Sequence, residues 1–160
     1  QTLVHHVHRT DDAGRDPGEI SFGAYVNVGS HPDLDAARAL IAGAVAAFAH
    51  FSSMPGSTGA GLAEADRAVV AEVGKRYDSN QHLSNAGPQT EALRPEFVDR
   101  FAVVGAPDSC ARRLHELADL GLERFVITGA SFGSDPEQAR TSNHLLVQEL
   151  LPALREGETV

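Results

Sequence analysis

Three short apolar segments, each followed by a helical pattern, constrain the fold of this chain most strongly. The segments are residues 20–29, 101–104 and 125–128. Each is rich in β-branched or aromatic residues and is bounded by turn residues, which is typical of β-strands. The first is apolar on both faces, as in a buried parallel strand. Strands that alternate with helices predict an α/β fold, in which right-handed crossovers build a parallel sheet.

Helical periodicity fills the segments between these strands. Apolar residues recur at steps of three and four over 32–51, 62–77, 107–120 and 135–151, and a short helix is predicted over 95–100. Asp135 is a strong helix cap, because Pro136 suits the first helical position and Gln138 can complete a capping box. Pro152 is expected to end or kink the last helix.

Size and charge limit the classes of protein to consider. The chain has 160 residues, enough for one domain but fewer than the roughly 200 of a closed (β/α)8 barrel. It begins with Gln1 rather than Met, so we expect a truncated chain, and it shows no signal-peptide pattern. A net charge of −9 argues against nucleic-acid and anionic-membrane partners. The single cysteine, Cys110, cannot form an internal disulfide, which favours a cytoplasmic location.

The segment from Phe101 onward carries a family resemblance. It reads FAVVGAPD at 101–108, LHEL at 114–117, LGLERFVI at 120–127 and LLPALR at 150–155. This combination resembles the C-terminal end of the bacterial luciferase-like monooxygenases, a family of flavin- and deazaflavin-dependent oxidoreductases. AGRDP at 13–17, FSSMPG at 51–56 and the later Tyr77, Asp78 and His82 look closer to the branch similar to methylenetetrahydromethanopterin reductase, which uses coenzyme F-420.

The resemblance implies a fold and an activity for the intact protein. The chain, residues 1–160, would form the C-terminal part of one (β/α)8 TIM-barrel domain, with strands six to eight and a helical insertion at about 52–100. The N-terminal part of the same barrel would be its partner, and the intact protein is expected to form a homo-oligomer. It would transfer hydride or oxygen to a small-molecule substrate through coenzyme F-420 or FMN. The alternative from the residues alone is a non-catalytic small-molecule binding or assembly module.

Candidate cofactor-binding residues lie at the carboxyl end of the first predicted strand, because sites in such folds lie at the carboxyl ends of strands. They are Asn27, Gly29, Ser30 and His31. Asn27 is strongly polar within a strand, so its amide binds either a ligand or the backbone. His31 precedes a helix start, where it contacts an anion or stays an exposed loop histidine.

The insertion supplies the candidate catalytic and substrate residues. The resemblance places it over the barrel mouth, with Tyr77 and Asp78 as substrate contacts and His82 as the catalytic residue. A histidine can donate a hydrogen bond or a proton near neutral pH. A solvated loop is the alternative interpretation of the same residues.

Three further patterns favour structural roles. The 129–134 loop, GASFGS, precedes a capped helix and either cradles a phosphate or simply turns a corner. His5, His6 and His8 lack a completing carboxylate or cysteine, so an exposed helix end is favoured over a metal site. Cys110 is expected to be a small buried residue, since no base motif adjoins it.

Overall fold

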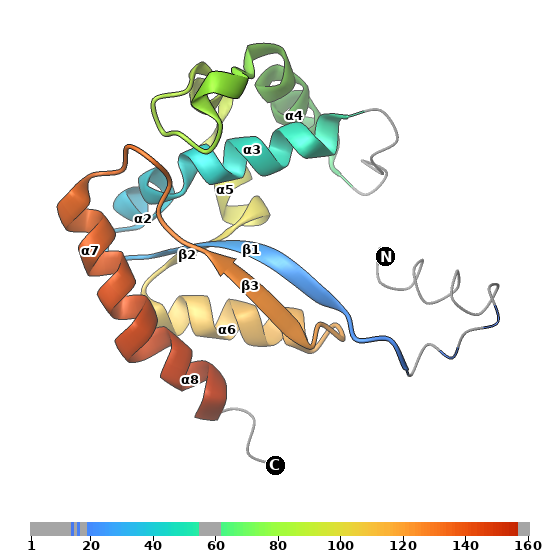
Figure 1. Ribbon diagram of the computed structural model, residues 1–160, viewed down its shortest axis with the longest axis vertical. Coiled ribbons are helices and arrows are strands. Elements are labelled where there is room, and N and C mark those ends of the chain that lie inside the picture. Colours follow the sequence, from blue (N-terminus) through green and yellow to red (C-terminus); the bar gives the residue numbers. More distant parts are fainter. Residues whose placement is uncertain (1–13, 15, 17–18, 55–61, 157–160) are drawn as a thin grey trace.

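Parallel pairing joins the three predicted strands into one sheet. The computed structural model describes residues 14, 16, 19–54 and 62–156, and its helices lie on both sides of this sheet (Figure 1). The strands are β1 (Gly23–Ser30), β2 (Val103–Gly105) and β3 (Arg124–Thr128). The last three residues of β1 pair with β2, and its first five pair with β3. The predicted parallel α/β architecture is therefore confirmed.

The order of the strands corrects one expectation. Consecutive strands of a barrel pair in sequence order, which would place β2 in the middle. The observed order is β2-β1-β3 in an open sheet of three strands among the described residues, and the complete barrel stays a prediction for the intact protein. The connection that produces this order is α6 (Pro107–Ala118), which follows the three-residue strand β2 and carries the chain beneath β1 to its other edge.

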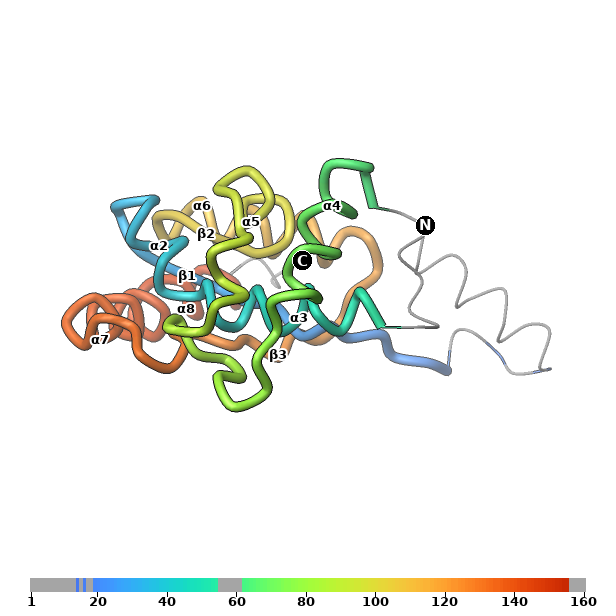
Figure 2. Tube along the Cα trace, turned by 90° about the horizontal axis from the view of Figure 1, so that it is seen from above, coloured from blue at the N-terminus to red at the C-terminus, as the bar shows by residue number. Residues whose placement is uncertain are grey.

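The predicted helices form with shifted ends. The remaining helical elements are α2 (Leu34–Leu40), α3 (Ala42–Ser53), α4 (Glu64–Arg76), η3 (Ser79–Gln81), η4 (Pro88–Ala92), α5 (Pro95–Phe101), α7 (Pro136–Leu145), η5 (Leu146–Leu150) and α8 (Leu151–Glu156). In Figures 1 and 2, α7 and α4 lie at opposite ends of the molecule.

The two ends of α7 show how single residues shape it. The Asp135 carboxylate accepts hydrogen bonds from the N–H groups of Glu137 and Gln138 at 3.1 and 2.9 Å, as the sequence predicts. Pro152 does not end the last helix, which runs on through α8. The π-helical turn η5 precedes it, and its wider spacing accommodates a residue without an N–H group.

The long helix predicted over 32–51 is wrong in one respect, because it is two helices. α2 and α3 meet at Ile41, whose φ of −114° and ψ of 7° are not helical, and the two axes are bent by 58°. No single helix in the described ranges is long and apolar enough to span a membrane. Only α2 and α3 taken together meet that test, and residues of both are buried in the core.

Two apolar cores hold the sheet between its helices. Alternation along β1 sends Val26 and Val28 toward α6 and α8, where they pack with Val103, Cys110 and Leu114. The second core lies among α3, α4 and α5 and includes Leu40, Ile41, Val45, Val73 and Phe97. Cys110 is fully buried, as predicted.

Candidate functional site

The insertion meets the carboxyl edge of the sheet through backbone hydrogen bonds. Phe132 N donates to Leu83 O at 3.0 Å, and Asn85 N donates to Phe132 O at 2.9 Å. Phe132 belongs to the loop that follows β3, so the segment just after His82 lies against the ends of the strands. This edge is where parallel folds place their sites.

Asn85 connects this edge to the break between α2 and α3. Its Oδ1 accepts from Gly43 N at 2.8 Å, and its Nδ2 donates to Ala39 O at 2.7 Å and to Ser134 Oγ at 3.0 Å. These bonds satisfy N–H and C=O groups that a helix break would leave without partners. The insertion therefore fixes the bend of the helix pair.

The loop after β3 completes the same network. Ser131 Oγ accepts from Ala44 N at 2.9 Å, Ser131 N donates to Leu40 O at 2.7 Å, and Ser134 Oγ lies 3.0 Å from Leu40 O. Both hydroxyls are thus engaged, and the Asp135 carboxylate already occupies the start of α7. The loop therefore serves as the turn between β3 and α7. A phosphate at the start of α7 would lie against the Asp135 carboxylate, which would repel it.

Tyr77, His82 and His50 form a cluster beside this edge. The Tyr77 hydroxyl is hydrogen-bonded to Nδ1 of His82. The His50 ring stacks on Tyr77 with centroids 3.7 Å apart and an interplanar angle of 7°. Burial raises the pKa of Tyr77, so its hydroxyl stays neutral at physiological pH and can accept from or donate to Nδ1. Phe51, 46% exposed, lies 6.0 Å from the His82 ring.

Asp78 is adjacent in the chain but has a different role. Its carboxylate accepts from Asn80 N at 2.9 Å and so caps η3, and its own N–H donates to Gln89 Oε1 at 3.3 Å. The structure therefore brings together Tyr77 and His82, while the Asp78 carboxylate stabilises the turn between them. A substrate contact at Asp78 stays a prediction.

Asn27, one of the four candidates at β1, lines a cavity. A Cβ atom at Gly29 would lie 2.3 Å from Ala37 O, so this glycine permits close packing of α2 on the strand. Ser30 is 1% exposed, and His31 Nδ1 accepts from Asp33 N at 3.0 Å. Cofactor binding at these three residues stays a prediction, and the geometry gives Gly29 and His31 a structural role, while the buried Ser30 hydroxyl has no hydrogen-bond partner among the described residues.

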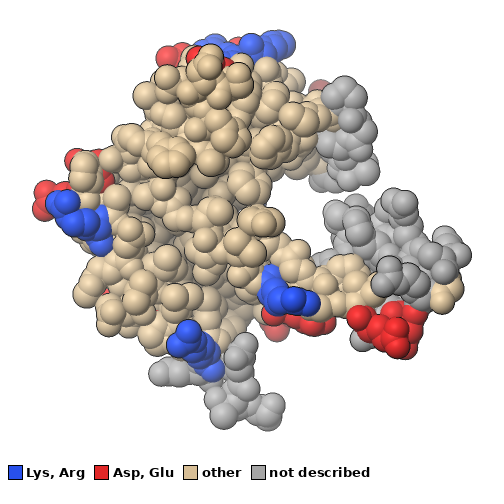
Figure 3. Space-filling view, viewed as in Figure 1, with Lys and Arg blue, Asp and Glu red and all other residues tan. Residues whose placement is uncertain are grey.

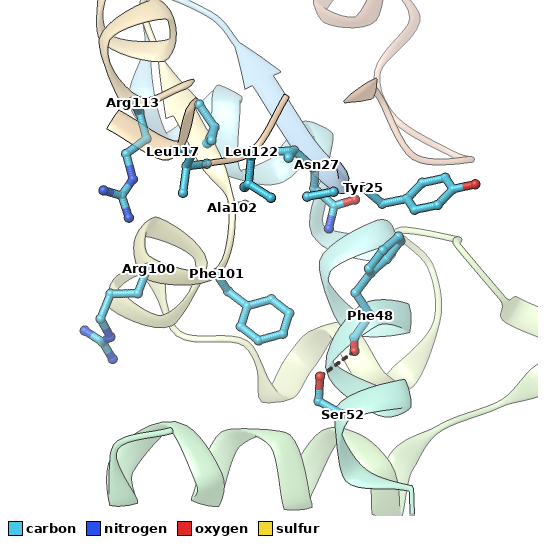
Figure 4. Close-up of a pocket in the computed structure, with 13 residues that line it drawn as sticks. Tyr25, Asn27, Phe48, Ser52, Arg100, Phe101, Ala102, Arg113, Leu117 and Leu122 are labelled. Carbon is cyan, nitrogen blue, oxygen red and sulfur yellow. Dashed lines mark hydrogen bonds between the residues drawn. The ribbon is translucent and has the colours of Figure 1, made fainter. Parts of the chain in front are cut away.

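The cavity beside Asn27 has a volume of about 320 Å³ (Figure 4) and lies along residues 24–27, the part of β1 that precedes its pairing with β2. Its lining includes Tyr25, Phe48, Ser52, Arg100, Phe101, Arg113, Leu117 and Leu122. The aromatic residues were missed as lining because Phe48 was predicted on the apolar stripe of a helix, and Tyr25 and Phe101 were predicted in apolar strands. Aromatic rings link this cavity to the Tyr77 cluster, because the ring centroids of Phe48 in the cavity wall and of Phe51 beside His82 lie 6.2 Å apart.

One face of the molecule carries little charge near its centre. Charged side chains lie mainly at the periphery of the face in Figure 3, with uncharged side chains over α3 and β3. Among the described residues, no group of three or more His, Cys, Asp or Glu side chains could hold a metal ion. His5, His6 and His8 lie outside the described residues.

Comparison with known proteins decides the family. The model of the luciferase-like monooxygenases matches residues 1–124. The chain belongs to this family. It is also 31% identical over 129 residues to a 5,10-methylenetetrahydromethanopterin reductase of Methanolobus tindarius, a match that covers 79% of this chain. The chain spans only part of that relative, since the match covers 37% of the relative's length. The predicted resemblance is therefore confirmed, and with it membership of an oxidoreductase or monooxygenase family.

Proposed function

We propose that this chain is the C-terminal part of an oxidoreductase that transfers hydride or oxygen to a small molecule through coenzyme F-420 or FMN. The family match and the reductase relative support the reaction class. The resemblance to the F-420-using branch makes that deazaflavin the first choice. The observation that carries the proposal is the hydrogen-bonded pair of Tyr77 and His82 beside the carboxyl edge of the sheet.

The pair supplies an acid–base group with a fixed orientation. For Nε2 of His82 to exchange a proton, Nδ1 must carry hydrogen and donate it to the Tyr77 oxygen. Because Tyr77 keeps its own proton, it acts as the orienting group and His82 as the acid or base. His50 holds the Tyr77 ring by stacking on it.

The residues at this edge fit one part of such a cofactor. A bound flavin or deazaflavin ring supplies or accepts hydride, and the exposed rings of Phe51 and His82 offer it an aromatic surface. They do not fit its phosphate at the start of α7, where Asp135 is the cap. The phosphate contacts are therefore assigned to the N-terminal part of the same barrel, which we also propose as the partner of this chain. We further propose that the intact protein is cytoplasmic and forms a homo-oligomer.

Cofactor binding and turnover test this proposal in the intact protein. Absorbance titration with oxidised and reduced coenzyme F-420 and FMN should show binding of one of them, and binding of neither would overturn the proposal. His82→Ala and Tyr77→Phe should each lower the rate roughly 5- to 150-fold, the effect of deleting one hydrogen-bonding group. His144→Ala, on the exposed surface of α7, is the matched control.

A non-catalytic small-molecule binding module is the second candidate function. The cavity beside Asn27 favours it, since it combines apolar walls with a buried polar group. This function predicts ligand binding with no cofactor and no turnover, which the same titration distinguishes.

A further inference from the structure

Asn27 places a hydrogen-bond donor without a partner inside the cavity. The side chain is 4% exposed, and its Oδ1 accepts from Thr128 Oγ1 at 2.6 Å. That bond fixes the amide orientation and leaves Nδ2 toward the cavity (Figure 4). Among the described residues Nδ2 has no hydrogen-bond partner. Nδ2 therefore presents a free N–H group to the space of the cavity, where a ligand that carries an acceptor can take its hydrogen bond.

Aromatic side chains form the walls around this donor. Phe48 reaches in from α3 and Phe101 from the end of α5 (Figure 4). Phe101 is held by stacking on Phe97, with centroids 4.8 Å apart, and Phe48 contacts Tyr25 at 6.4 Å. Walls held in this way suit a planar ring. The volume of about 320 Å³ is at the small end for ligand sites.

The charges at the rim indicate an uncharged ligand. Arg100 and Arg113 line the opening, but each already has a carboxylate partner. Arg100 is paired with Asp66, and Arg113 lies 2.7 Å from Glu116. These pairs neutralise the arginines, so they provide no net attraction for an anion.

We propose that this cavity binds a small uncharged aromatic carbonyl compound. Its ring packs against Phe48 and Phe101, and its carbonyl oxygen accepts a hydrogen bond from Nδ2 of Asn27. This site is separate from the proposed oxidoreductase site, because neither Tyr77 nor His82 lines it, and the proposal names the ligand class for the binding module given above as the second candidate. Its test needs no cofactor, so its failure and that of the proposed oxidoreductase are separate results.

Two ligands of the same shape test the hydrogen bond. Acetophenone carries the carbonyl, and α-methylstyrene replaces its oxygen with a CH₂ group. Titration of the ¹⁵N-labelled chain should show that acetophenone shifts the side-chain amide signals of Asn27. Acetophenone should also bind about 3- to 12-fold more tightly than α-methylstyrene, the worth of one hydrogen bond. Equal affinities, unshifted Asn27 signals, or no binding at millimolar acetophenone would each overturn the proposal.

A pair of variants tests whether the Asn27 amide itself causes the preference for acetophenone. Asn27→Leu keeps the side-chain size and removes the amide, so it should abolish the preference for acetophenone. Asn143→Leu, on the exposed surface of α7, should retain it. An Asn27→Leu protein that keeps the preference would refute the role of the amide. If that variant does not fold, the two-ligand comparison on the unaltered chain still decides.

Discussion

Asn85→Ala is expected to weaken the link between the insertion and the helix break. The substitution deletes the hydrogen bonds to Gly43 N, Ala39 O and Ser134 Oγ. Each such bond contributes about 0.5–1.5 kcal/mol, and a buried group left without a partner costs more. Gly43 is buried, so its N–H cannot turn to water instead. The expected loss in the free energy of unfolding is about 2–4 kcal/mol.

Urea unfolding followed by circular dichroism measures this loss. With a slope of about 2 kcal/mol per molar urea, the midpoint should fall by roughly 1–2 M at unchanged slope. Asn80→Ala is the matched control, because the Asn80 side chain bonds only the neighbouring Asp78 carboxylate. It should shift the midpoint by less than about 0.5 M. Equal midpoints for the two variants would refute the assigned role of Asn85.

Two further predictions concern close packing. Gly29→Ala should destabilise the chain by about 1–3 kcal/mol in the same assay, since the added Cβ would meet Ala37 O at 2.3 Å. Gly129→Ala, whose Cβ would have only an ordinary contact at 3.7 Å, should be nearly neutral, and the opposite ranking would contradict the packing argument. Burial raises the pKa of Cys110 from 9.0 to about 11, so its stabilising contribution is present below pH 9 and is lost as the pH rises toward 11. Native Cys110 should react with a thiol reagent at pH 8 only as the protein unfolds, and rapid reaction would show that this site is open.

Local signals predicted most elements of the fold. The cap at Asp135 and the strands around Val103 and Val126 follow from capping rules and β-branched runs. The break at Ile41 did not, because the residues that stabilise it, Asn85 among them, come from distant segments. The strand order was also hidden, since it depends on which edge of β1 each crossover reaches.

Some residues of the candidate site could likewise be selected from the sequence, and others could not. Tyr77 and His82 are five residues apart, and the family resemblance selected both, together with Asp78. His50 was not selected, because its helical spacing gave no sign that it stacks on Tyr77. Asn27 was selected as a polar residue in a strand. The cavity that it faces requires side chains from three helices that sequence periodicity cannot place.

The exposed face of the sheet supports a last prediction. Tyr25 and Val126 are cross-strand neighbours on this face and are 67% and 50% exposed. Sequence reasoning predicts that an isolated part of a barrel associates or packs loosely through such a face. Val126→Lys should therefore reduce association measured by light scattering and change the free energy of unfolding by less than about 1 kcal/mol.

Ile127→Lys is the matched comparison, because the next residue of a strand points to the opposite face. Ile127 packs against the core shared with α6 and α8, so a charge there should cost about 3 kcal/mol or more. Similar losses for the two variants would show that the face of Val126 is covered in solution. A large difference, with less association for Val126→Lys alone, would establish this open face as the surface through which the isolated chain associates.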